Sequence, residues 1–264
     1  MEFWLLYLAT GVFAGFLAGL LGVGGGLVIV PVLALIFAAQ HFPDGQIMHL
    51  ALGTSLASIL FTSVSSLRAH HAHGAVKWRV VRGITPGIIA GTLAGTVVAA
   101  QLSSLFLKVF FVVFLYYVAT QMVLNIRPKP SRELPGAAGM FGAGGVIGAV
   151  SSLVGIGGGT LSVPFMTWCN VKMHQAIGTS AAIGFPIAAA GAVGYIVNGW
   201  MLEMLPAHSL GFVYLPALAG LVVASVLTAP FGARLAHRLP VDRLKKFFAL
   251  LLYVLGTRML VSLF

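Results

Sequence analysis

Long apolar runs dominate the hydrophobic pattern of this chain, and two of them are interrupted by clustered glycines. The first run, Phe3 to Ala39, contains Gly22-Val23-Gly24-Gly25-Gly26, with Pro31 just beyond. One helix across a hydrocarbon core of ~30 Å needs about 20 residues, so this run is too long for a single span. We therefore predict two helices, Phe3–Leu21 and Leu27–Ala39, joined by a glycine break.

The same construction returns in the second half of the chain. Gly155-Ile156-Gly157-Gly158-Gly159 interrupts a second apolar run, with Pro164 at the same offset as Pro31 in the first. The predicted helices here are 136–154 and 161–169. The helices that follow the breaks are too short to cross the membrane, since a 13-residue helix rises only about 20 Å.

The remaining apolar segments have the length of ordinary membrane spans. We predict helices over 47–67, 83–100, 105–124, 175–197, 210–235 and 247–264. The stretch 125–135 carries three prolines with Arg127, Lys129 and Arg132, and it alone resembles a domain boundary. The pattern therefore predicts an all-α polytopic membrane protein with one membrane repeat at 1–124, a linker at 125–135 and a second repeat at 136–264.

Polar residues and helix breakers support the duplication beyond the glycines. His49 and Gly53-Thr54-Ser55 match His174 and Gly178-Thr179-Ser180, and Tyr116 and Thr120 match Tyr253 and Thr257. Pro86 is matched with Pro216. Agreement at this many positions is hard to attribute to apolar composition alone.

Loop charge indicates that the two repeats are inverted. The loop 68–82 is strongly basic, whereas its counterpart 198–208 has no Lys or Arg. Basic loops face the cytoplasm, so matching loops with opposite bias lie on opposite sides. We expect loop 68–82, the linker 125–135 and loop 234–246 in the cytoplasm, and both termini and loop 198–208 outside. Each repeat is then a glycine-broken re-entrant hairpin plus three transmembrane helices.

Composition narrows the class of protein further. Of 264 residues, 59% are hydrophobic and 8% charged, and the mean hydropathy is +1.03, which excludes a soluble domain. The formal charge of +10 lies in short loops, so it indicates membrane orientation rather than nucleic-acid binding. The single Cys169 excludes an intrachain disulfide and a cysteine-based metal site. Met1-Glu2 leads directly into apolar sequence, so we expect the first segment to stay in the membrane.

The glycine breaks predict a binding site for a small anion between the repeats. Unpaired backbone groups are not tolerated in hydrocarbon, and helix N-termini attract anions through free N–H groups and the helix dipole. Hydroxyls near the breaks add donors. The candidate substrate-binding residues are Gly24, Gly25, Gly26, Thr54, Ser55, Gly157, Gly158, Gly159, Thr160, Thr179 and Ser180, and Ser151, Ser152 and Ser162 flank the second break. His49 and His174 are candidates for proton coupling, and no metal or cofactor is expected.

Alternative interpretations remain open from the sequence. Glycine stripes such as Gly11/Gly15 and Gly91/Gly95 are explained by close helix packing, and hydroxyls in apolar helices often bond to their own backbone. All five acidic residues lie in loops or at chain ends, which argues against a cation carrier. An anion channel is the nearest rival to a carrier. An intramembrane hydrolase would need a partnered nucleophile, which Ser151 and Ser152 lack.

The two glycine motifs resemble those of the TauE/SafE sulfite exporter family of membrane permeases. The resemblance rests on the stretch from Gly15 to Gly26 with Pro31, on Val154 to Gly159 with Pro164, and on the Gly-Thr-Ser elements. It implies a multi-pass protein of the bacterial inner membrane that moves sulfite, sulfonates or related sulfur oxyanions. Export by alternating access is the expected activity, and the alternative is uptake of sulfate, thiosulfate or carboxylate-like anions. An oligomer is compatible with this resemblance.

Overall fold

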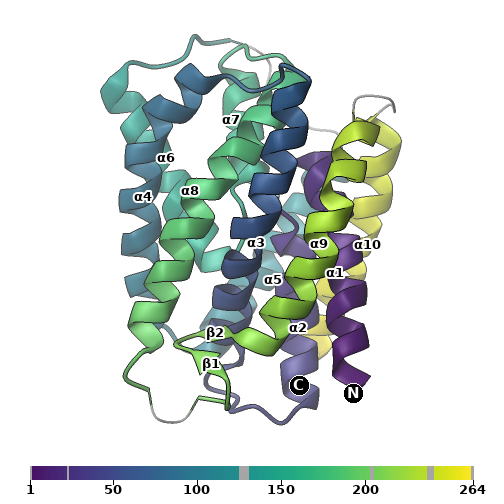
Figure 1. Ribbon diagram of the computed structural model, residues 1–264. Helices are drawn as coiled ribbons and strands as arrows, with labels where there is room; N and C mark the ends of the chain where they lie inside the picture. Colours follow the sequence, from purple (N-terminus) through teal and green to yellow (C-terminus); the bar gives the residue numbers. More distant parts are fainter. Residues whose placement is uncertain (1, 23, 125–130, 203–204, 237–240, 263–264) are drawn as a thin grey trace.

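The computed structural model is almost entirely helical (Figure 1) and describes residues 2–22, 24–124, 131–202, 205–236 and 241–262. The helices are α1 (Glu2–Leu21), α2 (Gly26–Ala39), α3 (Ile47–Ala72), α4 (Trp78–Gln101), α5 (Ser104–Val123), α6 (Ala137–Val154), α7 (Gly159–Trp168), α8 (Met173–Gly199), α9 (Leu215–Ala236) and α10 (Val241–Val261). Two short strands, β1 (Ser209–Leu210) and β2 (Val213–Tyr214), form an antiparallel hairpin before α9.

Helix lengths support a multi-pass membrane protein. Seven helices in the described part of the chain are long and apolar enough to cross a membrane. The helices that follow the glycine breaks are shorter, with 14 residues in α2 and 10 in α7. At 1.5 Å per residue they rise only about 21 Å and about 15 Å, as the sequence predicted.

Four predicted boundaries are wrong, and three of them have a physical reason. Helix α3 continues past Leu67 to Ala72, and α4 begins at Trp78 rather than at residue 83, because helices extend beyond the hydrocarbon into the polar layer. Helix α9 begins at Leu215, since the β hairpin occupies the residues assigned to its first turn. Helix α10 begins at Val241 within the basic stretch that was predicted to be loop.

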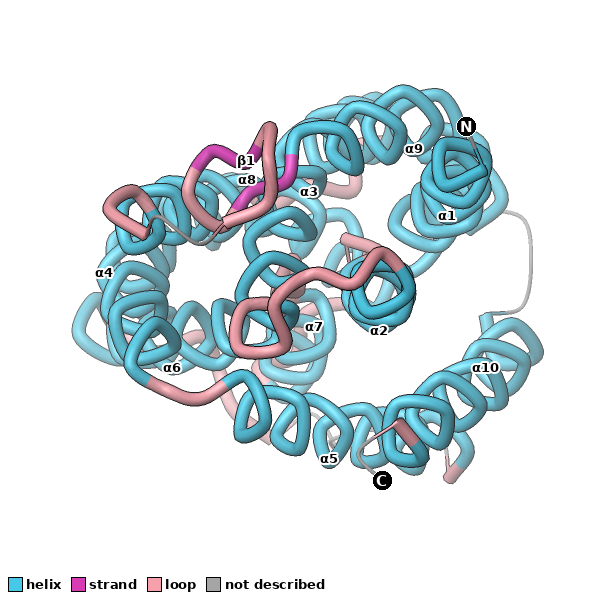
Figure 2. The backbone as a smooth tube through the Cα atoms, turned by 90° about the horizontal axis from the view of Figure 1, so that it is seen from below, coloured by secondary structure: helices cyan, strands magenta, loops and turns pink. Residues whose placement is uncertain are grey.

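Each glycine-broken segment forms a hairpin of two helices. The first hairpin begins with α1 at the lower end of the molecule and returns there with α2 (Figure 1). The second begins with α6 at the upper end and returns there with α7. In the perpendicular view, α2 and α7 lie near the centre, surrounded by the longer helices (Figure 2). The tips of the two hairpins therefore meet inside the helix bundle.

Small residues let the first arm of each hairpin pack closely against a helix from the other half. Helix α1 lies along α9, and α6 lies along α4. A Cβ on Gly11 would lie 2.7 Å from the carbonyl oxygen of Leu221, and one on Gly91 would overlap the carbonyl oxygen of Gly145. The packing interpretation of these glycine stripes is confirmed.

The same contacts correct the match of Pro86 with Pro216. Gly144 packs against the backbone of Ile84, and Gly11, at the equivalent position in the first half, packs against the backbone of Leu221. Ile84 therefore corresponds to Leu221, and Pro86 has no counterpart at Pro216. The hairpin before α9 accounts for the shift, because the described residues of the first half form no such strands.

Basic residues gather at one end of the molecule. The upper end in Figure 1 holds the junction of α3 with α4, the start of α6 and of α8, and the junction of α9 with α10. The cations at these positions whose side chains are described are Arg68, Lys77, Arg79, Arg82, Arg132, Lys172, Arg234 and Lys246. Only Lys108 and Arg258 lie near the lower end among the described cations. The positive-inside rule predicts that the upper end faces the cytoplasm.

Two glycines in open space allow this orientation to be tested. No atom lies within 4 Å of a Cβ added to Gly45 or to Gly136. Gly45 closely precedes α3 and Gly136 directly precedes α6, and these helices begin at opposite ends of the molecule (Figure 1). We expect a membrane-impermeant maleimide to label Gly45→Cys in intact cells, and Gly136→Cys only after permeabilisation. The reverse result would invert the orientation.

The native thiol provides a silent background for that experiment. Cys169 is buried, and burial raises the pKa of its thiol more than nearby Arg132 lowers it. A raised pKa leaves less thiolate near neutral pH, and the thiolate is the reactive form. We expect the unmodified protein to label much more slowly than either variant at pH 7, and rapid labelling would contradict the buried placement.

Candidate functional site

The two glycine breaks touch at the centre of the bundle. A Cβ added to Gly24 would lie 3.0 Å from the Cα of Gly157 and 3.1 Å from its nitrogen. One added to Gly26 would overlap the carbonyl oxygen of Gly155. The hairpin tips predicted to face each other are thus brought together, and glycine is required at this contact because no side chain fits between the backbones.

Backbone conformation sets a second requirement for glycine at the breaks. Gly25 and Gly158 cap α2 and α7 with φ values of 79° and 78° and the same ψ of −9°. Gly24 also has a positive φ of 80°. Left-handed backbone costs an L-residue roughly 1–2 kcal/mol, so these turns favour glycine even where space is available.

The serines of the two Gly-Thr-Ser elements each bind the opposite break. Ser55 Oγ on α3 donates to the carbonyl oxygen of Gly155 at 2.8 Å, and Ser180 Oγ on α8 donates to that of Gly22 at 3.0 Å. Ser180 also donates to Ile177 of its own helix at 2.8 Å. These hydroxyls satisfy carbonyl groups that the breaks release from the helical ladder.

The threonines of the same elements also connect the two halves. Thr54 Oγ1 accepts from the backbone nitrogen of Tyr214 at 2.9 Å, and Thr179 Oγ1 accepts from that of Lys77 at 2.9 Å. Tyr214 and Lys77 each directly precede a long helix, α9 or α4. The Thr hydroxyls therefore anchor helix starts at the two ends, away from the glycine contact.

We expect the hydrogen bonds of Ser55 and Ser180 to stabilise the contact between the two glycine breaks, which we call the crossing. Ser55→Ala leaves the buried carbonyl of Gly155 without this donor and should lower the free energy of unfolding by about 1–3 kcal/mol. Ser180→Ala should act similarly, and the double mutant should show coupling of about 0.5 kcal/mol or more because both bonds stabilise one contact. Denaturation in detergent measures both effects.

Thr10→Val serves as the control for that experiment. Thr10 is buried in α1 and donates only to Leu6 of its own helix at 2.7 Å. Its removal should change stability by less than either serine substitution. Equal losses in all three variants would show that the serine bonds have no special role.

The short helices present free amides beside the crossing. The carbonyl oxygen of Gly25 accepts from Val28 and Ile29, and that of Gly158 accepts from Leu161 and Ser162. The amides of Gly26, Leu27, Gly159 and Thr160 precede these ladders. Three hydroxyls around the start of α7 are buried and lack a hydrogen-bond partner, namely Ser151, Thr160 and Ser162. Both features favour an anion.

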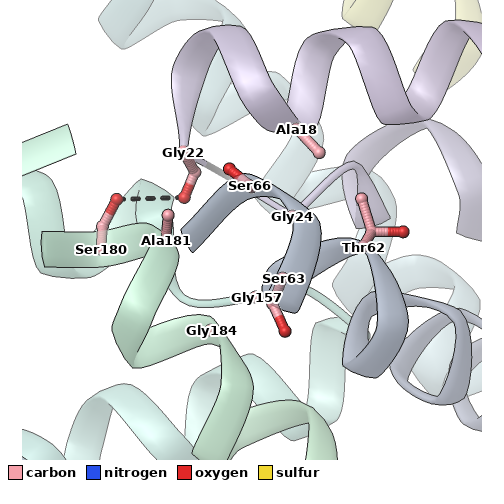
Figure 3. A pocket seen from close by; sticks show the side chains of 10 residues that line it. All are labelled: Ala18, Gly22, Gly24, Thr62, Ser63, Ser66, Gly157, Ser180, Ala181 and Gly184. Atoms are coloured by element: carbon pink, nitrogen blue, oxygen red, sulfur yellow. Dashed lines mark hydrogen bonds between the residues drawn. The ribbon is translucent and has the colours of Figure 1, made fainter. Parts of the chain in front are cut away.

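A narrow cavity lies against the crossing (Figure 3). It has a volume of about 10 Å³, room for about one water molecule. Its lining is Ala18, Gly22, Gly24, Thr62, Ser63, Ser66, Gly157, Ser180, Ala181 and Gly184. The cavity thus combines both glycine breaks with hydroxyl-bearing residues of α3 and α8.

Three lining residues of α3 were missed at the level of sequence. Ser66 Oγ is buried and has no hydrogen-bond partner, whereas Ser63 donates to Leu60 at 3.0 Å and Thr62 shares a hydrogen bond of 2.7 Å with Ser225. A usable signal existed, because Ser58, Thr62 and Ser66 recur every fourth residue and mark one face of an apolar helix.

The matched histidines have different surroundings. His49 is 4% exposed, its Nε2 lies 3.0 Å from the carbonyl oxygen of Ala99, and its ring stacks on Phe212 at 4.9 Å. His174 is exposed at the start of α8. Neither lines the cavity, and His49 precedes Ser55 by a helical rise of about 9 Å. A role in proton coupling remains a prediction.

Fold and site together define a class of protein. A multi-pass helical bundle whose broken helices meet at a polar centre is the architecture of membrane transporters. The sequence matches the family described as Sulfite exporter TauE/SafE over residues 7–259. The chain belongs to this family and is a membrane transporter, as the resemblance of its glycine motifs predicted.

Similar curated proteins carry the same general description. The chain is 40% identical to a "Probable membrane transporter protein" of Haemophilus influenzae over 262 residues, which is 98% of this chain and 99% of the relative. It is 26% identical to "Probable membrane transporter protein MJ0441" of Methanocaldococcus jannaschii, over 97% of this chain and 95% of the relative. No solved structure matches the chain significantly.

Proposed function

We propose that this protein is a secondary transporter of the bacterial inner membrane for a small sulfur-containing oxyanion, such as sulfite or an organosulfonate. Two inverted repeats, 1–124 and 136–264, would be joined by a cytoplasmic linker at 125–135. Residues 125–130 of that linker lie outside the described part of the chain. Export by alternating access is the mode of transport that we infer.

The observation that carries this proposal is the contact of the two glycine breaks beside a hydroxyl-lined cavity. An anion at this position would be reached by the N-terminal amides of both short helices, and glycine allows the approach because it has no Cβ. The unpartnered hydroxyl of Ser66 on α3 would supply a further donor. This arrangement needs no cationic side chain.

The charges available at the centre also favour an anion. Among the described residues, the buried polar side chains are serines, threonines and two histidines, with no aspartate or glutamate. Sodium and proton carriers commonly use an acidic residue at membrane depth, because a carboxylate balances the cation. A neutral site with many hydrogen-bond donors instead suits a sulfur oxyanion, whose oxygens accept hydrogen bonds.

The two faces of the crossing differ in a way that suits alternating access. Thr62, Ser63 and Ser66 line the cavity, whereas the residues at the matched positions of α8 are Ile187, Ala188 and Gly191. Ala181 and Gly184 in α8 are likewise replaced in α3 by larger side chains, Leu56 and Ile59.

Ile59 and Ile187 pack against the glycine breaks, at Gly24 and Gly158, whereas Leu56 packs against Gly191 of α8. A Cβ on Gly24 would lie 3.2 Å from Ile59 Cγ2, and one on Gly191 would lie 2.7 Å from Leu56 Cδ1. Leu56, Ile59 and Ile187 are fully buried. We assign this combination, a hydroxyl-lined cavity and fully buried apolar side chains, to a closed conformation.

Transport would require the two tips to separate. The cavity of about 10 Å³ holds one water molecule and not a sulfur oxyanion. Rocking of one repeat against the other would widen it and open each face in turn. A fixed channel would instead need a continuous polar path.

Ligand-induced stabilisation of the purified protein tests the substrate class. Sulfite, sulfate, thiosulfate, taurine and sulfoacetate are added separately, and the melting temperature is measured in detergent. A ligand at 100 times its Kd stabilises the folded state by about 2.7 kcal/mol, so a binding anion should raise the melting temperature clearly. No response to any anion, with a response to a cation, would overturn the proposal.

A further inference from the structure

We propose that a groove between α3 and α9 binds an anionic phospholipid, with its phosphate held by Arg68 and Arg234. The groove has a volume of about 500 Å³ and lies apart from the central cavity. Nothing in this inference depends on which anion is transported.

Both walls of the groove have the same gradient of polarity. On α3 the groove is lined first by Phe61, Val64 and Ser65, then by Arg68, and beyond it by Ala69, Ala72 and His73. On α9 it is lined by Val226, Pro230 and Arg234, at a spacing of four. Both helices run toward the same end of the molecule (Figure 1), and on each the arginine follows Val64 or Pro230 in that direction.

The groove opens to the outside of the bundle and is separated from the central cavity. Phe61 is 47% exposed, and Arg68 and Arg234 are exposed as well. Behind the groove, Thr62 shares its hydrogen bond with Ser225, and Ser65 donates to the carbonyl oxygen of Val226 at 2.9 Å. These two contacts close the seam between α3 and α9.

Position and charge together select the occupant. An apolar groove on the outer face of a membrane protein is filled by acyl chains, and guanidinium groups at its end bind phosphate through paired hydrogen bonds. The Arg234 guanidinium also lies 5.6 Å above the ring of Phe231, an exposed residue of the same helix. A zwitterionic lipid carries a compensating ammonium group and fits this rim less well.

The matched pair of helices in the other half, α8 and α4, lacks these cations. The residues that correspond to Arg68 and Arg234 are Val193 on α8 and Val97 on α4, which are 55% and 48% exposed. The paired arginines are therefore not required for packing two long helices in this fold. They are a feature of one groove, at the end predicted to face the cytoplasm.

Native mass spectrometry of the purified protein with phosphatidylglycerol and phosphatidylcholine tests the proposal. We expect preferential binding of phosphatidylglycerol, reduced about tenfold or more in Arg68→Gln/Arg234→Gln and restored in Arg68→Lys/Arg234→Lys. Arg79→Gln/Arg82→Gln removes the same charge from the same end outside the groove and should change binding less than twofold. Glycerol phosphate at millimolar concentration should not compete, because it lacks acyl chains.

Three results would overturn the proposal. Equal losses in the two glutamine pairs would show that the arginines act only through net charge. Equal binding of both lipids to the unmodified protein would exclude recognition of the phosphate. Competition by glycerol phosphate would identify a site for free anions instead. Ala69→Trp, which fills the groove and keeps both arginines, should also lose the lipid.

Discussion

Replacing Gly24 or Gly157 with leucine should abolish transport and leave the protein in the membrane. The backbones of these glycines touch, so a side chain at either position forces the tips apart. Gly24 also has a φ of 80°, which disfavours any L-residue. We expect transport of labelled sulfite into proteoliposomes to fall at least about a hundredfold, since a displacement of 1 Å can cost that much at a preorganised site.

Gly142→Ala is the matched control for this experiment. Gly142 lies in α6, and no atom lies within 4 Å of an added Cβ. Alanine has a higher helix propensity than glycine, so this variant should retain transport and be slightly more stable. Normal transport by Gly24→Leu would show that the contact of the tips is unimportant. Loss of membrane insertion would point to a structural role alone.

We expect removal of the Ser66 hydroxyl to weaken anion binding without destabilising the protein. Ser66 Oγ lines the cavity, is buried and has no protein partner, so its removal should leave stability unchanged or slightly raised. A hydrogen bond to a charged ligand contributes about 1.5–3 kcal/mol, which predicts a rise in Kd of about tenfold or more. Melting curves and ligand titration of Ser66→Ala measure the two effects separately.

Ser58→Ala shows whether that effect is specific to the cavity. Ser58 is buried on the same helix, but its Oγ donates to the carbonyl oxygen of Ser55 one turn earlier at 2.8 Å. Ser58 does not line the cavity. Its substitution should leave Kd within about twofold, since it removes only a local bond. An equal loss of affinity in both variants would place the anion elsewhere.

The sequence predicted the parts of this fold that depend on unusual residues. The clusters Gly22–Gly26 and Gly155–Gly159 indicated two breaks, because glycine in an apolar helix is costly unless the backbone must turn. Both breaks are present, and their tips meet. Loop charge also predicted which loops share an end of the molecule (Figure 1), because that charge depends on local composition alone.

Packing contacts between distant segments were beyond the reach of the sequence. Ser55 and Ser180 were predicted to donate to substrate, but in this conformation each donates to the carbonyl of the opposite break. Ser66 was not predicted as a site residue, because hydroxyls in apolar helices usually bond to their own backbone. The hairpin before α9 was also not predicted, because three of its four paired residues are apolar or aromatic and continue the apolar run of the helix.

Counterflow exchange in liposomes tests the central claim, which is a carrier site that opens alternately between two repeats. Liposomes loaded with unlabelled sulfite are diluted into labelled sulfite, and uptake is compared with that of empty liposomes. The account predicts stimulated, transient accumulation of label, which Gly24→Leu abolishes. Uptake that internal sulfite does not stimulate would indicate a channel, and the absence of any anion-dependent exchange would contradict the account.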